Sequence, residues 1–218
     1  MPQKKRTPKT AAGKERKSIF QKSGTQKNGH NKSDSYLEKF FTDQLKDIYY
    51  AENKILEGLK KMEESSTTDE LKDAFKEHHT QTEKHVRRLE KVFGLLGKKA
   101  EGEKCDAIEG ILKEADSIIE ETQEGSMTRD AALIFAAQKV EHYEIATYGG
   151  LVQFAITMGY HEAADILDRT LREEENTDAL LTEIAENDIN LGAEHESMED
   201  FGDKEESRNE TLGVLSNN

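Results

Sequence analysis

The sequence of 218 residues predicts an all-α protein. Its two prolines, Pro2 and Pro8, lie close to the N-terminus, so no proline interrupts a helix in the rest of the chain. Long stretches rich in Glu, Lys, Leu and Ala favour helices, and apolar residues recur at helical spacing. These features predict four long helices and one shorter helix.

The first long helix is predicted from about Tyr36 to Met62. One acidic residue, Glu52, falls within the apolar stripe that should face the protein core. The other members of this stripe are all hydrophobic: Phe41, Leu45, Ile48, Ile55, Leu59 and Met62.

The second long helix is predicted from about Asp69 to Leu96, after a Ser-Ser-Thr-Thr segment that provides N-cap residues. Polar side chains replace hydrophobic ones at the centre of its inward face. This face comprises Leu71, Phe75, His78, Thr82, His85, Leu89 and Val92. A glycine-rich loop follows, and then a shorter helix from about Cys105 to Thr122.

The run from Ala131 to Gly159 is the least polar part of a chain that is 35% charged. It contains only three charged residues, Lys139, Glu141 and Glu144, and it predicts a helix that its neighbours bury. Glu141 and Glu144 lie on one face, one turn apart. Because buried carboxylates are costly without a partner, they indicate a bound cation, with an exposed and solvated pair as the alternative. A membrane span is disfavoured, because the charges lie near the middle of the run.

The last long helix is predicted from about His161 to Asn187, and its apolar stripe is interrupted midway by Glu174 and Asp178. Each of the four long helices therefore carries a potential metal ligand near its centre, and these ligands should meet in one layer. Carboxylates and imidazoles suit iron or manganese, and bridging carboxylates hold two ions close together. The predicted ligands are Glu52, His78, Glu141, Glu144, Glu174 and Asp178.

Other interpretations of the single residues stay open. His78 alone is typical of a hydrogen-bonded core histidine, and Glu174 lies within Glu173-Glu174-Glu175, which is typical of a solvated surface. The prediction of a metal site rests on the joint placement of the residues in one layer.

The charge is distributed unevenly along the chain. Residues 1–35 contain ten Lys or Arg against Glu15 and Asp34, a net charge of +8, whereas the whole chain has −14. We expect residues 1–35 to form a disordered basic tail that contacts nucleic acid through phosphates, or that pairs with the acidic body. Residues 36–190 are predicted to form the helical domain, and residues 191–218 an acidic mobile tail.

The sequence favours a cytoplasmic protein. The N-terminal segment is basic but lacks the apolar run of a signal peptide. A single cysteine, Cys105, excludes a disulfide framework within the chain and suits a reducing compartment.

Several motifs resemble the YciE/YciF family of bacterial stress-associated proteins, within the ferritin-like superfamily. The resemblance covers roughly Tyr36 to Asn190. It is carried by Asp47-Ile-Tyr-Tyr-Ala-Glu52, by Ala74-Phe-Lys-Glu-His78, by Lys104-Cys-Asp-Ala-Ile-Glu-Gly110, by Leu171-Arg-Glu-Glu-Glu-Asn-Thr-Asp178 and, most specifically, by the central segment from Arg129 to Gly149. It implies a ferritin-like four-helix bundle with an extra helix in a long crossover, a homodimer, and two iron or manganese ions per chain.

The superfamily pattern has Glu-x-x-His on the second and fourth helices, and the sequence departs from it on both, since the fourth helix offers Glu174 with Asp178. On the second helix, His78 is followed by Gln81, which is neutral, and a site with fewer anionic ligands holds its second ion less well. His85, seven residues after His78, is a further imidazole on the same face, although it lies two turns farther along the helix.

Two functions are compatible with these observations. In the first, a di-metal centre in a stress-response protein acts on peroxide or oxidises ferrous iron, with Tyr49, Tyr143 or Tyr148 as nearby partners. In the second, the protein is structural or binds DNA or another partner, and its metal site is vestigial. The sequence contains no nucleophilic triad, phosphate-binding glycine loop or zinc-type cysteine cluster.

Overall fold

The computed structural model describes residues 35–197, and within this range every regular element is a helix. The predicted basic tail, residues 1–35, therefore lies outside the described residues except for Ser35. Of the predicted acidic tail, residues 191–218, only the part up to Ser197 is described. The helices are α1 (Tyr36–Ser65), α2 (Asp69–Leu95), α3 (Asp106–Glu121), α4 (Met127–Met158), α5 (His161–Ile184), a π-helical turn (Ala185–Ile189) and α6 (Asn190–His195).

The helix ends are fixed by side chains of the residues that flank them. The hydroxyl groups of Ser35, Thr68 and Ser126 each accept a hydrogen bond from the backbone N–H three residues later, at the N-termini of α1, α2 and α4. At the other end of α4, Gly159 has a φ of 81°, a conformation that glycine adopts without steric cost. The chain then reverses within two residues and continues as α5.

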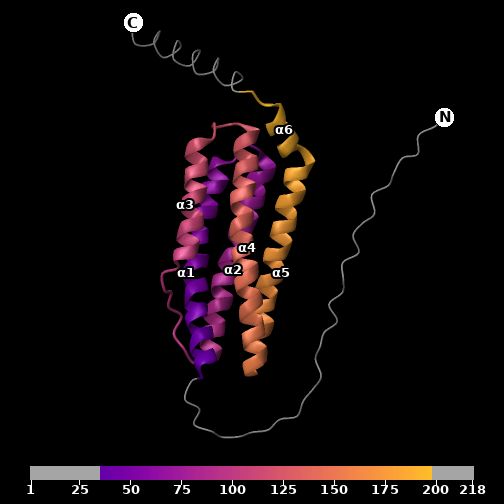
Figure 1. The fold of residues 1–218 in the computed structure, drawn as a ribbon. Helices are drawn as coiled ribbons and strands as arrows, with labels where there is room; N and C mark the ends of the chain where they lie inside the picture. Colours follow the sequence, from indigo (N-terminus) through magenta and orange to yellow (C-terminus); the bar gives the residue numbers. More distant parts are fainter. Residues whose placement is uncertain (1–34, 198–218) are drawn as a thin grey trace, which may run out of the picture. The chain divides into compact units, whose positions relative to one another are not determined.

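The four long helices form a bundle in which α1 contacts α2 and α4, and α5 contacts the same two helices. Figure 1 shows these helices side by side, with α3 alongside α1. Because the α1–α2 and α4–α5 connections span only three and two residues, each of these pairs is antiparallel. The long connection from α2 to α4 carries α3, which packs on α1 and α4. The predicted four-helix bundle with an extra helix in its crossover is confirmed.

The neighbours of α4 explain why its sequence is apolar almost all round. It packs against α1, α3 and α5, so most of its circumference is covered by other helices. Leu133, Val140, Leu151 and Ala155 are buried along it, and Glu141 and Glu144 are buried between them. The carboxylates therefore lie inside the bundle, not on a solvated face.

The helical domain extends five residues beyond the boundary predicted at residue 190, because α6 continues to His195. Just after it, the carboxylate of Glu196 accepts hydrogen bonds from the backbone N–H groups of Met127 and Thr128, at 2.6 and 2.8 Å. This contact joins the end of the described chain to the N-terminus of α4. Among the described residues, no helix is long and apolar enough to cross a membrane.

Candidate metal centre

Six ionisable side chains meet in the middle of the bundle, and all four long helices contribute. Each of the six is at most 3% exposed to solvent. They are Glu52 from α1, His78 and His85 from α2, Glu141 and Glu144 from α4, and Glu174 from α5. Two further buried residues, Thr82 and Tyr148, complete the polar part of the core in this region.

The six side chains form two groups that share one residue. In the first, potential ligand atoms of His78, Glu141, Glu144 and Glu174 lie within 4.8 Å of one another. In the second, those of Glu52, His85 and Glu174 do so. The Glu174 carboxylate lies between the two imidazoles, with Oε1 2.8 Å from His85 Nδ1 and Oε2 3.8 Å from His78 Nε2. This is the arrangement of a bridging carboxylate between two metal positions.

Most polar atoms that face the centre of the cluster lack hydrogen-bond partners. Eight such atoms belong to the six residues: Glu52 Oε2, His78 Nε2, His85 Nδ1, Glu141 Oε2, both carboxylate oxygens of Glu144 and both of Glu174. His78 Nε2 lies 3.1 Å from Glu141 Oε1 and His85 Nδ1 lies 2.8 Å from Glu174 Oε1, which are ion-pair distances when the imidazoles are protonated. Buried polar atoms are rarely left unpaired, so this concentration calls for a missing partner. Two divalent cations would also balance the formal charge of the four carboxylates.

The outward nitrogen of each imidazole, by contrast, has a defined hydrogen-bond partner. His78 Nδ1 lies 3.3 Å from Thr177 Oγ1, and that hydroxyl donates to the carbonyl oxygen of Glu173. The hydroxyl therefore accepts from His78 Nδ1–H, which leaves Nε2 directed into the cluster as the nitrogen that can bind a metal once it has lost its proton. His85 Nε2 lies 2.9 Å from Glu173 Oε2, which leaves Nδ1 directed inward. Such outer contacts orient metal-binding histidines.

Glu173 is itself held in place by Arg88. The guanidinium donates to both carboxylate oxygens, at 2.7 and 2.8 Å. Hydrogen bonding to Arg88, assisted by His85, lowers the pKa of Glu173 to about 2. The carboxylate that orients His85 is therefore ionised throughout the physiological pH range.

Burial, together with the charges of the metal-free cluster, shifts its pKa values strongly. Burial, reinforced by Glu174, raises the pKa of Glu52 to about 7 against the opposing effect of His85. Burial and the nearby carboxylates of Glu174 and Glu52 raise the pKa of Glu144 well above its usual value. Burial alone would lower the pKa of His78, but attraction to Glu141 and Glu174 outweighs it and raises this pKa to about 9. Without cations, the cluster therefore retains protons at neutral pH.

Among the three tyrosines expected near the site, Tyr148 contacts the cluster directly. It is fully buried, and its hydroxyl donates a short hydrogen bond to Glu52 Oε1. Tyr143 instead donates to Asp47 Oδ2 at 2.9 Å, and Tyr49 donates to Glu90 Oε1 at 3.2 Å. Tyr148 is thus the tyrosine placed to position a ligand.

The structure brings five of the six predicted ligands together. Asp178 lies outside both groups and is partly exposed, with Oδ1 3.2 Å from Gln138 Nε2 and 3.3 Å from His142 Nε2. His85, which the sequence suggested less strongly, belongs to the second group. The buried Oε1 of Gln81 has no hydrogen-bond partner.

Comparison with known sequences identifies relatives over most of the folded part. A family model described as "Domain of unknown function (DUF892)" matches residues 36–194. Protein YciF of Escherichia coli (strain K12) is 41% identical over 162 residues, which cover 74% of this chain and 97% of that protein.

Solved structures show the same fold. The crystal structure of the E. coli stress protein YciF matches with a TM-score of 0.68, covering 72% of this chain and 98% of the other. YcfI from Rhodopseudomonas palustris, described as a candidate structural protein, is 37% identical and matches with a TM-score of 0.66. The match covers 71% of this chain and 98% of YcfI. A protein of Xanthomonas campestris pv. campestris, 23% identical with a TM-score of 0.59 over 72% and 97%, supports the fold alone.

Proposed function

This chain belongs to the DUF892 family and is a relative of the stress protein YciF, and we propose that it is a stress-response protein whose buried cluster binds two iron or manganese ions. The observation that carries this proposal is the set of eight buried ligand atoms that converge from four helices without hydrogen-bond partners, with both imidazoles facing carboxylate oxygens at 2.8 to 3.8 Å. In a core that serves stability alone, apolar side chains would be expected at these positions, because buried carboxylates without cationic partners destabilise a fold.

The ligands divide into two positions that share Glu174. His78, Glu141 and Glu144 would hold one ion with Glu174, and Glu52 and His85 would hold the other. Such ions, when bound, supply one-electron chemistry toward peroxide or ferrous iron. A ligand set of carboxylates and two imidazoles suits these metals better than zinc or copper, which bind thiolates or richer nitrogen sets more commonly.

Neighbouring side chains hold these ligands in position. Glu173 and Thr177 fix the two imidazoles, and Tyr148 donates to Glu52. Because Tyr148 is fully buried and its hydroxyl donates to Glu52, it fixes the position of that carboxylate at the site. These contacts orient the ligand side chains toward the centre, as an efficient ligand arrangement requires.

The test is the metal content per chain, measured by mass spectrometry on protein purified without chelator from cells supplied with iron and manganese. About two equivalents are expected in the wild type, and none in the double variant Glu141→Ala, Glu144→Ala. A matched pair is provided by Glu174→Gln and Glu175→Gln, because Glu174 is buried in the cluster and Glu175 is exposed. Absence of metal from the wild type, or equal metal in this pair, would contradict the proposal.

A structural role is the second candidate, favoured by the description of the R. palustris relative. In that case the cluster is vestigial. Peroxide consumption and ferrous oxidation by the metal-loaded wild type, compared with Glu174→Gln, distinguish the two functions. Equal and negligible rates with both proteins would favour the structural role.

A further inference from the structure

A cavity of about 90 Å³ lies directly beside the metal centre, between α2 and α5. Two candidate ligands, His78 and Glu141, form part of its lining and are buried. Other lining residues, Glu77 and Asn176, are exposed to solvent. The cavity therefore connects the surface of the bundle with the first of the two ligand groups.

The polar side of this cavity suits a cation, and the rest of its lining is apolar: Ala74, Phe75, Leu180 and Leu181. The polar side includes the carboxylates of Glu77 and Glu141, and none of the lining residues in the described part of the chain is Lys or Arg. The amide oxygen of Gln81 is buried without a hydrogen-bond partner, although the side chain lies in the cavity wall. An acceptor oxygen without a hydrogen-bond partner, in a wall that also contains two carboxylates, matches the donors of a hydrated metal ion.

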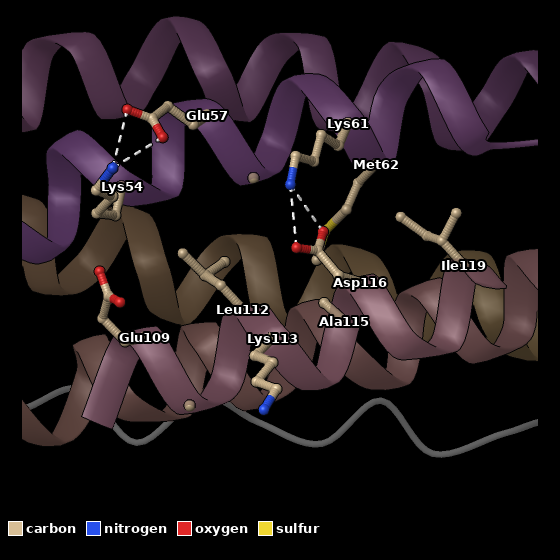
Figure 2. Close-up of a pocket in the computed structure, with 12 residues that line it drawn as sticks. Lys54, Glu57, Lys61, Met62, Glu109, Leu112, Lys113, Ala115, Asp116 and Ile119 are labelled. Atoms are coloured by element: carbon tan, nitrogen blue, oxygen red, sulfur yellow. Dashed lines mark hydrogen bonds and ion pairs between the residues drawn. The ribbon is translucent and has the colours of Figure 1, made fainter. Parts of the chain in front are cut away.

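Two other cavities of the described chain do not share these properties. Figure 2 shows the larger groove of about 460 Å³ between α1 and α3, where Lys54 pairs with Glu57 and Lys61 pairs with Asp116. Lys113 also lines this groove, and none of the six clustered residues does. A void of about 10 Å³ reaches Glu141 but is otherwise lined by apolar residues.

We propose that the cavity between α2 and α5 is the route by which divalent metal ions reach the centre, an inference that rests on the proposed metal binding. Its volume accommodates about three water molecules at roughly 30 Å³ each, which is enough for a partly hydrated ion. Glu77 attracts the cation at the surface, Gln81 accepts hydrogen bonds from its water molecules, and His78 and Glu141 are the first ligands at the inner end.

The charge of Glu77, at the solvent-exposed end of the cavity, provides the sharpest test. Glu77→Lys reverses a charge in the cavity lining, whereas Glu83→Lys makes the same change on α2 at an exposed position outside the lining. Metal-free full-length protein is mixed with Co²⁺, and uptake is followed by visible absorption in a stopped-flow instrument. We expect Glu77→Lys to slow uptake about tenfold at low ionic strength and Glu83→Lys to leave it near the wild-type rate. High salt should reduce the difference.

A second variant narrows the cavity without changing its charge. Ala74 lines the cavity and is half-buried, so Ala74→Phe should slow uptake of Co²⁺ at every salt concentration. The amount of Co²⁺ bound at equilibrium separates the two proposals. No binding by the wild type would overturn the metal centre itself. If Glu77→Lys binds as much Co²⁺ per chain as the wild type and takes it up at the wild-type rate, the proposed route is wrong. This conclusion holds whether or not Ala74→Phe folds.

Discussion

Glu52→Gln is expected to stabilise the metal-free protein, although it removes a candidate metal ligand. Glu52 is completely buried, and its pKa in the fold is about 7, against 4.5 in an exposed glutamate. Above pH 4.5 the unfolded chain releases this proton, whereas the folded chain retains it until about pH 7. The unfolded state therefore binds fewer protons, and stability falls as the pH rises between these values. The amide of the variant would accept the Tyr148 hydrogen bond without this dependence on pH.

The size of the effect follows from the two pKa values. Their difference of about 2.5 corresponds to about 3 kcal/mol at neutral pH, at 1.36 kcal/mol per pKa unit. For a domain of this size, each kcal/mol changes the melting temperature by about 2 to 4 °C. Glu52→Gln should therefore melt roughly 6 to 12 °C above the wild type in chelator at pH 7, and at about the same temperature as the wild type near pH 4.

The assay is thermal unfolding followed by far-UV circular dichroism, in chelator and in saturating Mn²⁺. The matched control is Glu57→Gln on the same helix, because Glu57 is exposed and pairs only with Lys54 among its described contacts. This control should change the melting temperature little. With Mn²⁺ the order should reverse, because the wild type gains binding free energy that the variant loses. If Glu52→Gln melts at or below the wild type in chelator at pH 7, the cluster is not destabilising without metal and the reasoning is refuted.

Three further results are expected. In chelator, the free energy of unfolding of the wild type should fall by up to about 3 kcal/mol as the pH rises from 6.5 to 9. Protonated His78 stabilises the fold below pH 6.5, and this contribution is lost as the pH passes the His78 pKa of about 9. Chemical denaturation at several pH values measures this change. Arg88→Met should weaken metal affinity about 10- to 100-fold in a chelator competition, because Glu173 then no longer holds His85, whereas unchanged affinity would show that this contact is dispensable. Nucleic acid should be retarded in a gel by the full chain but not by a chain that lacks residues 1–35, and equal behaviour of the two would exclude a role for this segment.

The sequence was sufficient to predict the bundle and most of the cluster. The apolar sequence around Glu141 and Glu144 predicted that both are buried. The structure gives the reason, since three other helices cover α4. Glu52 and His78 could be identified by their interruption of apolar stripes. The order of the helices around the bundle could be expected only through the resemblance to a family, because periodicity gives the inward face of a helix but not its neighbours.

The position of His85 could not be predicted with the same certainty. Seven residues separate it from His78, or about 10 Å along a helix, so a single ion cannot be assumed to contact both. The structure places the two rings 6.4 Å apart, with Glu174 in reach of each. The site is therefore extended along the bundle axis, and this extension depends on side-chain directions that helical spacing does not determine.

The three consecutive glutamates of α5 show most clearly why the sequence alone leaves the site incomplete. Successive residues of a helix are rotated by about 100°, so identical side chains point in different directions. Glu174 points into the cluster between the imidazoles, Glu173 points to Arg88 and orients His85 from outside, and Glu175 is exposed. Asp178, one turn after Glu174, is rotated by about 40° from it and meets Gln138 and His142 instead. The chemical identity of these four residues is nearly the same, so their distinct roles arise from the packing of α5 against α2 and α4. The metal content of Glu173→Gln, Glu174→Gln and Glu175→Gln should accordingly fall into three classes: reduced, absent and unchanged.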